Sequence, residues 1–178
     1  KESQILRNIF LLHETPVTAV MTPRPVVFSL SEEMTVDAFF TAHYDTRFSR
    51  IPIYENDREH LVGFVLKGDL LLGHSRGNSD KKLKDYCRDL KAMPETKTVY
   101  DAFEYFIQER LHIMMIVDEY GGMEGIITLE DILETLLGLE IMDEKDKQID
   151  MQEHARQLWR RRARAMGLEI PAKNSGLE

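Results

Sequence analysis

Hydrophobic and polar positions along the chain follow a pattern that occurs twice, about 63 residues apart. Thr35 and Thr98 each precede apolar residues at helical spacing, and either hydroxyl could cap a helix. Three further features recur: a strand-like run, a second run led by glycine, and an Asp-led helix start, at 49–54 and 112–117, 63–66 and 125–128, and 69–71 and 131–133. The repeat predicts two copies of one β-α-β-β-α unit, which must pack together because a unit of about 60 residues buries little core alone.

The first strand of each predicted unit has the weakest signal. Val26–Phe28 and its poorer counterpart Leu90–Met93 are the candidates. The two later strands of each unit are expected to form a hairpin, and Gly121-Gly122 would supply the positive φ that such a turn needs. The second helices are expected from about Asp69 and Leu129, which completes a mixed α/β (or α+β) fold.

Composition and motifs exclude several classes of function. The net charge is −8 and disfavours non-specific binding to nucleic acid. The single cysteine, Cys87, forms no internal disulfide and suggests a reducing compartment, and no apolar run approaches the roughly 18 residues of a membrane span. Phosphate-loop, dinucleotide, zinc-protease and nucleophile-elbow motifs are missing, so we expect no catalytic site. A hydrolase would have to use Glu130, the single base that we can name for it.

Thr128 and Asp131 form the most informative element of the sequence. They lie three residues apart where a strand ends and a helix begins, so a hydroxyl and a carboxylate project together beside backbone N–H groups. Such an arrangement can hold a phosphate and ribose hydroxyls. An ordinary capping Thr with a first-turn acid explains the same residues. In the first unit the matching segment is Leu66-Lys67-Gly68-Asp69, which keeps the Asp and lacks the hydroxyl.

The segment Ser49-Arg50-Ile51-Pro52 is the second informative element. Pro52 removes a ladder donor, so this strand should be an edge strand or should end its pairing there. Backbone groups freed in this way could bind the edge of a nucleotide base, while Arg50 binds a phosphate. The alternative is an ordinary edge strand whose Arg50 is solvated. His112, which matches Ser49, is either a half-buried histidine bonded to backbone or a ligand contact.

Four motifs in this order resemble the CBS pair of the CorC/CNNM group: Met21-Thr22-Pro23-Arg24, 49–54, 117–122 and 125–131. Members of this group are membrane proteins linked to magnesium or cobalt transport, some of them labelled hemolysin-like. The similarity runs from about Glu2 to Asp146. The resemblance implies a Bateman module, in which two CBS motifs are related by a pseudo-twofold axis. It further implies a homodimer, no metal site of its own, and a regulatory ligand, AMP or ATP, the latter with Mg²⁺.

The resemblance also implies site residues. The main nucleotide pocket would use residues from both units: Ser49, Arg50, Ile51, Pro52, Arg88, Leu90, Thr128 and Asp131. A weaker second pocket would use Thr22, Asp69, His112 and Met115, with Leu66 in place of the usual hydroxyl. A module of this kind that binds no ligand and serves dimerisation alone is the competing hypothesis. A melting temperature that adenine nucleotides leave unchanged would favour it.

The expected organisation has five parts: an N-terminal helix and linker at 1–19, CBS motifs at 20–72 and 87–140, a linker at 73–86, and a C-terminal helical tail at 141–178. The chain starts without Met, and we expect it to be a piece of a longer protein whose transmembrane domain lies upstream, which would put the module on the cytoplasmic side. In the tail, Ala155, Trp159, Ala163 and Met166 lie near one helical face among arginines. This face either docks on the body or contacts anionic lipid.

Overall fold

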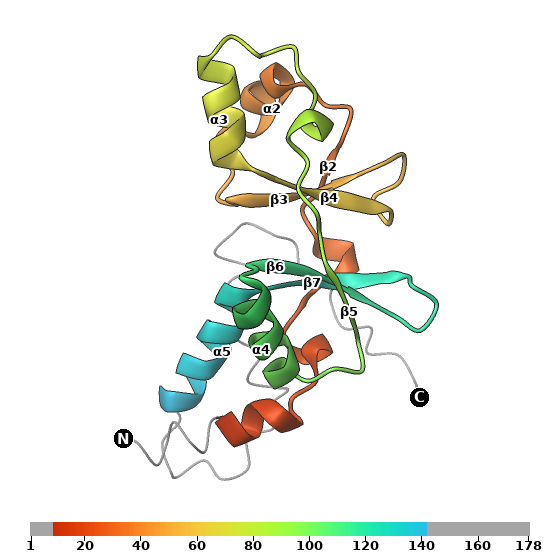
Figure 1. Cartoon of the computed structure of the whole chain (residues 1–178), viewed down its shortest axis with the longest axis vertical. Helices are drawn as coiled ribbons and strands as arrows, with labels where there is room; N and C mark the ends of the chain where they lie inside the picture. Colours follow the sequence, from red (N-terminus) through yellow and green to blue (C-terminus); the bar gives the residue numbers. More distant parts are fainter. Residues whose placement is uncertain (1–8, 142–178) are drawn as a thin grey trace, which may run out of the picture.

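The computed structural model describes residues 9–141 of the chain, and they form two lobes stacked along the longest axis (Figure 1). The first lobe contains β2 (Leu30–Ser31), α2 (Val36–His43), β3 (Arg50–Tyr54), β4 (Leu61–Leu66) and α3 (Lys67–Ser75). The second contains β5 (Ala92–Pro94), α4 (Val99–Glu109), β6 (Ile113–Val117), β7 (Met123–Thr128) and α5 (Leu129–Ile141). The predicted β-α-β-β-α order is therefore confirmed in both halves.

The two sheets have matching registers. In the first lobe β2 runs parallel to β3 and β3 antiparallel to β4. In the second lobe β5 runs parallel to β6 and β6 antiparallel to β7. Leu30 opposite Ile53 corresponds to Met93 opposite Ile116, each residue shifted by 63 positions. This correspondence is the pseudo-twofold relation that the resemblance implied.

One predicted strand was wrong. Val26–Phe28 is not a strand: Arg24–Val26 form a 3-10 helix, η2, and the strand follows at Leu30–Ser31. Pro25 explains the difference, because its fixed φ and missing N–H suit the first turn of a helix and weaken a ladder. The second-unit candidate overlaps β5, which begins at Ala92.

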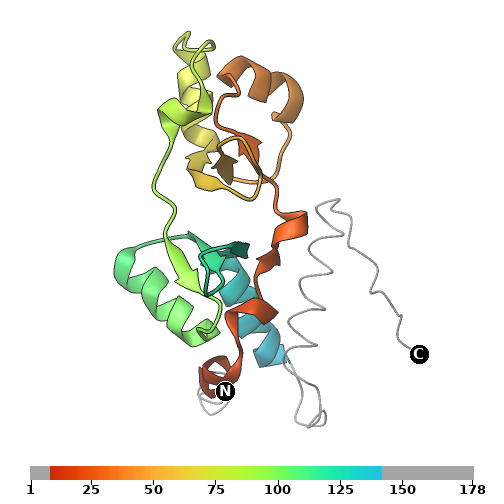
Figure 2. The ribbon, with the colours of Figure 1, turned by 90° about the vertical axis from the view of Figure 1, so that its right-hand side faces the viewer.

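The N-terminal segment, which precedes the first repeat, packs on the second lobe. The linker, which precedes the second repeat, packs on the first lobe, so two separate segments run between the lobes (Figure 2). Val17 N donates to Lys97 O at 3.0 Å, and the symmetry-related Leu83 N donates to Met34 O at 2.9 Å. Val17, in η1 (Val17–Ala19), and Leu83, in η3 (Leu83–Tyr86), are both fully buried. Both linkers thus contribute to a core, each to the core of the lobe that it reaches.

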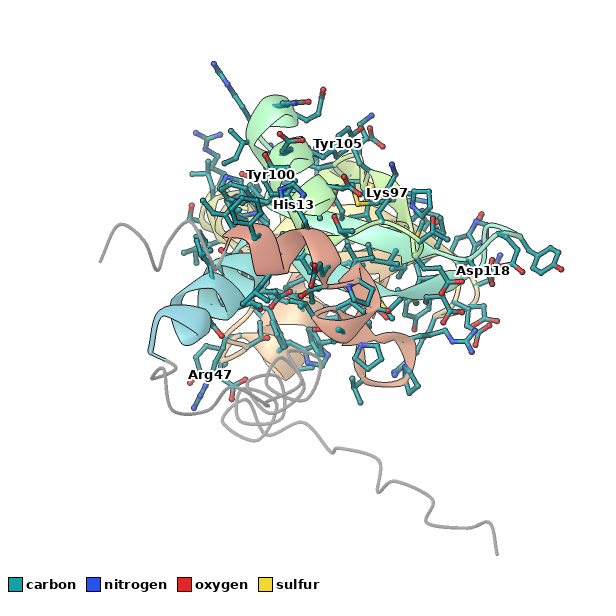
Figure 3. All side chains as sticks on the ribbon, turned by 90° about the horizontal axis from the view of Figure 1, so that it is seen from below. His13, Arg47, Lys97, Tyr100, Tyr105 and Asp118 are labelled. Atoms are coloured by element: carbon teal, nitrogen blue, oxygen red, sulfur yellow. The ribbon has the colours of Figure 1, made fainter. Side chains whose placement is uncertain are left out.

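Two buried apolar clusters reflect this exchange. The cluster of the second lobe includes Leu12, Val17 and Val20 from the N-terminal segment, together with Phe106 and Ile127. The cluster of the first lobe takes Leu83 from the linker, together with seven residues of its own lobe: Leu30, Val36, Phe39, Ile51, Ile53, Val65 and Leu70. Residues 9–14 are helical, and there His13 stacks on Tyr100 of α4 with ring centroids 3.7 Å apart (Figure 3).

Two glycines let the exchanged segments approach closely. Thr22 and Pro23 form β1, which pairs with β7 through Ile126 and Gly125. A Cβ on Gly125 would lie 2.4 Å from Thr22 O, and a Cβ on the equivalent Gly63 would lie 2.5 Å from Arg88 O. Since real Cβ atoms do not come this near to a carbonyl oxygen, both crossings require glycine.

The predicted caps and turn are present. The Thr35 hydroxyl accepts from Ala38 N at 3.2 Å, and the Thr98 hydroxyl accepts from Asp101 N at 3.2 Å. In the β6–β7 hairpin Gly121 has φ +82°, while Asp118 Oδ1 accepts from Gly122 N at 2.7 Å. The side chain of Asp118 therefore organises the turn that the two glycines had predicted.

Candidate functional site

The start of α5 is held by a reciprocal pair of hydrogen bonds. Thr128 N donates to Asp131 Oδ2 at 2.7 Å, and Asp131 N donates to the Thr128 hydroxyl at 3.2 Å. Asp131 is only 5% exposed, so its carboxylate is fixed in place by backbone rather than solvated. The capping explanation of these two residues is therefore confirmed. It also leaves a hydroxyl and a carboxylate rigidly side by side, as a binding site requires.

The backbone N–H groups of this helix start are mostly occupied. Leu129 N donates to His112 O at 3.1 Å, and Asp131 N is bonded to Thr128. The expectation that these N–H groups would be free for a phosphate is wrong for Leu129 and Asp131, because β6 and the cap satisfy them first. A phosphate held here would therefore need a cation from elsewhere in the chain as its counter-charge.

Arg50 is a cation that lies at this helix start. It opens β3 in the first lobe, and its Nη1 lies 3.8 Å from Oε1 of Glu130, on the first turn of α5 in the second lobe. The side chain of Arg50 is 28% exposed and that of Glu130 is 60% exposed. The strand that carries Pro52 thus faces the helix start that carries Thr128 and Asp131, as the resemblance implied.

The start of α3 is the equivalent place in the first lobe, and it is built differently. Leu66 provides no side-chain cap for α3. Asp69 instead binds Arg88, whose Nε and Nη2 lie 3.1 and 2.7 Å from the same Oδ2. The Asp69 side chain is 35% exposed and the Arg88 side chain 51% exposed. Lys67 also lies here and donates to Thr46 O at 2.8 Å.

This arrangement corrects how the predicted residues were grouped. Arg88 was expected beside Thr128 and Asp131, and Thr22 beside Asp69. Arg88 instead bonds to Asp69, and Thr22 pairs with Ile126 of β7, two residues before Thr128. The exchange of segments between lobes is the reason, because each incoming segment joins the sheet of the opposite half.

Pro52 affects pairing on one side of its strand. β3 is the middle strand of its sheet rather than an edge, and it pairs with β4 throughout. On the other side β2 starts at the position opposite Ile53, directly after Pro52. In the second lobe Met115 occupies the equivalent position and donates its N–H to Lys91 O at 2.8 Å. The proline therefore ends pairing on the β2 side, as one of the two predicted alternatives stated.

The remaining predicted residues differ in how available they are to a ligand: Ile51 is buried, whereas Ser49 and His112 are exposed, so His112 is not the half-buried histidine of the first alternative. Ile51 is fully buried in the first core, so only its backbone can contribute. Ser49 and His112 use their carbonyl groups to accept from Lys67 N and Leu129 N, at 2.9 and 3.1 Å. Leu90 is partly buried in the segment that crosses between lobes, and Met115 is partly buried on β6.

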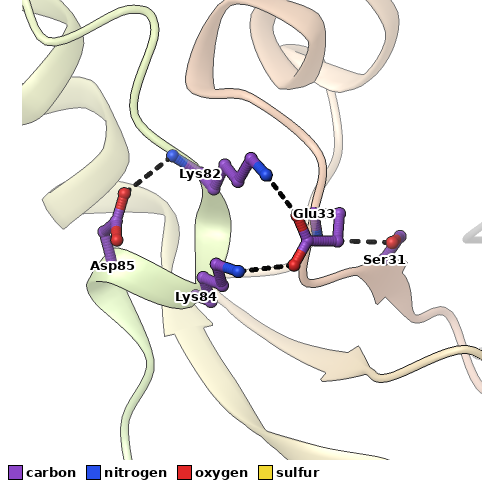
Figure 4. A network of polar contacts seen from close by, with 5 residues as sticks. All are labelled: Ser31, Glu33, Lys82, Lys84 and Asp85. Atoms are coloured by element: carbon purple, nitrogen blue, oxygen red, sulfur yellow. Dashed lines mark hydrogen bonds and ion pairs between the residues drawn. The ribbon is translucent and has the colours of Figure 1, made fainter.

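A charged cluster that the sequence reasoning missed fastens the linker to the first lobe (Figure 4). Glu33 bonds to Lys82 Nζ and to Lys84 Nζ, the latter at 2.5 Å, and these bonds lower the pKa of Glu33 to about 2. The same bond raises the pKa of Lys84. Lys82 N completes the cluster by donating to Asp85 Oδ2 at 2.9 Å. The sequence does not reveal this cluster because its members lie about 50 residues apart and charged residues in a linker have no characteristic spacing.

Residues 9–141 also contain a cavity that lies apart from the predicted nucleotide residues. A cavity of about 390 Å³ lies in the first lobe between residues 25–31 and the β3–β4 hairpin, and its lining includes none of the predicted nucleotide residues. No group of three or more His, Cys, Asp or Glu in this range could hold a metal ion. No helix of this range has the length and apolar character needed to cross a membrane. The predicted tail face with Trp159 lies outside the described residues.

Comparison with known families and proteins gives a consistent result. A family model for the CBS domain matches residues 17–73 and 83–138. The UPF0053 protein sll1254 of Synechocystis sp. is 36% identical over 155 residues, which cover 87% of this chain and 44% of that protein. The magnesium and cobalt efflux protein CorC of Escherichia coli is 30% identical over 163 residues, covering 90% of this chain and 56% of CorC. The chain thus spans about half the length of the curated relatives it matches.

Solved structures agree with these relatives. The CBS domain of a bacterial CNNM/CorC family Mg²⁺ transporter, determined in complex with ATP, is similar with a TM-score of 0.72 and 28% identity, over 77% of this chain and 97% of that one. A hemolysin-like protein containing a CBS domain, from Oenococcus oeni, is similar with a TM-score of 0.66 and 25% identity, over 73% and 96% of the two chains.

Proposed function

The chain belongs to the CBS-domain family, and on this premise we propose that it is a regulatory module that binds an adenine nucleotide between its two lobes. The observation that carries the proposal is the meeting of Arg50 from the first lobe with the start of α5 in the second. A cation, a hydroxyl and a fixed carboxylate converge there from segments far apart in sequence, which is the equipment that a nucleotide requires.

Each residue has a chemical role in this proposal. A carboxylate can accept several hydrogen bonds, and that of Asp131, which is held by Thr128 N, would accept ribose hydroxyls. The Thr128 hydroxyl already accepts from Asp131 N, and its O–H remains able to donate to a phosphate or ribose oxygen. Arg50 would leave Glu130 for the phosphates, and β1 with Thr22 would form the wall beside them.

ATP with Mg²⁺ is the first ligand to test, because a related CBS structure was determined with ATP. AMP is the second. Calorimetry with AMP, ADP and ATP, each with and without Mg²⁺, gives affinity and stoichiometry. We expect saturable binding and a rise in melting temperature with nucleotide concentration. No heat and no shift at millimolar nucleotide would leave the alternative, a ligand-free dimerisation module, as the better description.

A homodimer is part of the proposal. Leu71, Leu72 and Leu133 on α3 and α5 are 57%, 48% and 40% exposed, and apolar helix surface of this kind suits a second copy. Sedimentation should give twice the chain mass, and Leu71→Asp with Leu72→Asp should give the monomer. A monomer already in the wild type would remove this part and leave the nucleotide site unaffected.

The wider role rests on the relatives. We propose that the module is regulatory and non-catalytic, and that it lies on the cytoplasmic side of a CorC/CNNM-like membrane protein of divalent-cation transport. Release of phosphate from ATP by the purified chain, abolished by Glu130→Gln, would instead support a hydrolase. For the arginine-rich tail we propose contact with anionic lipid. Truncation after Glu153 should then reduce binding to phosphatidylserine vesicles.

A further inference from the structure

The start of α3 has the same place in its lobe as the start of α5. Asp69 corresponds to Asp131, Leu66 to Thr128, and Arg88 to Thr22, because the crossing segments pair with β4 and β7 in the same way. Asp69 therefore has the position of the carboxylate to which the proposed function gives the ribose hydroxyls. On backbone geometry alone, the chain has two related places for a nucleotide.

Arg88 already occupies the carboxylate in the first lobe. Its guanidinium bonds to Asp69 Oδ2 through two nitrogens, at 3.1 and 2.7 Å. The guanidinium is charged and holds this oxygen through two donors at once, so an uncharged ribose hydroxyl must displace an ion pair to reach it and competes poorly.

The backbone prevents Arg88 from moving away. Phe64 N donates to Arg88 O at 3.0 Å, and Arg88 N donates to Phe64 O at 2.8 Å. Gly63 packs so closely that a Cβ there would lie 2.5 Å from Arg88 O. Only side-chain rotation can free Asp69, and it would leave the carboxylate without its cation.

We propose that Arg88 is a specificity-determining residue that closes the first-lobe position from within, so that the chain binds one nucleotide rather than two. The inference rests on the proposed function. It predicts that residues 66 and 88 together decide which helix start can bind a nucleotide: Leu66 lacks the hydroxyl, and Arg88, bound to Asp69, has the position that the smaller Thr22 has in the second lobe.

The test transfers the second-lobe residues to the first lobe. Calorimetry with ATP and Mg²⁺ should give one equivalent per wild-type chain and two for the double variant Leu66→Thr, Arg88→Thr. Arg76→Thr, which removes an equal charge from the exposed C-terminal end of α3, is the matched control and should keep one equivalent. Circular dichroism and the melting temperature establish that each variant is folded.

The outcomes separate the two proposals. One equivalent in both the wild type and the folded double variant, or two in the wild type, overturns the role of Arg88 and leaves the nucleotide site intact. Binding by the double variant alone supports closure by Arg88 and removes the α5 site. Absence of binding by every folded variant overturns both. The reverse change, Thr22→Arg, should abolish wild-type binding in a chain that still melts cooperatively, and unchanged binding would count against the inference.

Discussion

The starts of α5 and α3 occupy equivalent places in two copies of one fold, yet the aspartate at each start has different hydrogen-bond partners. At α5 the chain uses neighbours three residues apart, Thr128 and Asp131, and the carboxylate becomes buried. At α3 it uses Arg88, 19 residues away, and the ion pair stays half exposed. The repeated backbone therefore determines where a site can exist, and a few side chains determine which copy is available.

Replacing the two aspartates gives the largest expected contrast. Asp131→Ala removes a buried bond to Thr128 N and should lower the free energy of unfolding by about 1–3 kcal/mol. It should also weaken nucleotide binding about tenfold to a hundredfold, because charge-assisted bonds to the ribose are lost. Asp69→Ala breaks a half-exposed ion pair and should cost less than about 1 kcal/mol.

Asp69→Ala is also the matched control for binding. Calorimetry on both variants, at a temperature where each is folded, separates lost ligand contacts from lost stability. Equal affinities for Asp131→Ala and Asp69→Ala would show that the two helix starts do not differ in function.

The glycines at the two crossings should behave alike, in contrast to the aspartates. Gly125→Ala and Gly63→Ala each push a Cβ against backbone, and each should destabilise the chain by about 1–3 kcal/mol in urea unfolding. Only Gly125→Ala should also weaken nucleotide binding, because it displaces β1 beside Thr128.

Gly68→Ala is the control for these glycines, since a Cβ at this helical position would have nothing within 4 Å. It should be neutral or stabilising by up to about 1 kcal/mol. A loss comparable to that of Gly63→Ala would mean that the close crossing is not the cause.

The sequence predicted most of the fold because its strongest signals are local. The caps at Thr35 and Thr98, the hairpins and the second helices all follow from residues within a few positions of one another. The η2 turn was missed because apolar residues beside prolines mimic a strand. Arg88 was misplaced for a different reason: exchange of segments between lobes is a tertiary feature, and no periodicity records which sheet a linker joins.

A smaller effect concerns the contact between the lobes. Glu130→Gln removes the carboxylate that holds Arg50 and repels phosphate, so ATP affinity should rise by up to about fivefold, the worth of an exposed pair. The rise should be greater for ATP than for AMP, which carries fewer charges. Calorimetry repeated at roughly 1 M salt should remove the difference in ATP affinity between the variant and the wild type, because the salt screens the charges. A loss of affinity would mean that Glu130 itself contacts the ligand.

The smallest expected effect is confined to the first lobe. Glu33 bonds Lys82 and Lys84 of the linker, and the equivalent positions in the second lobe are Pro16 and Thr18, which cannot form such a cluster. Its pKa falls from 4.5 to about 2 in the folded chain, so its contribution to stability is complete above about pH 4.5 and is lost as the pH falls toward 2.

Melting temperatures of the wild type and Glu33→Gln should therefore differ at pH 7 and converge as the pH is lowered from 4.5 to 2. The difference should be modest and should shrink in salt, because the cluster lies at the surface. Glu95→Gln, in the matching loop of the second lobe, is the control and should show no such convergence. A wild-type advantage that stays constant down to pH 2 would mean that Glu33 stabilises the linker by packing rather than by charge.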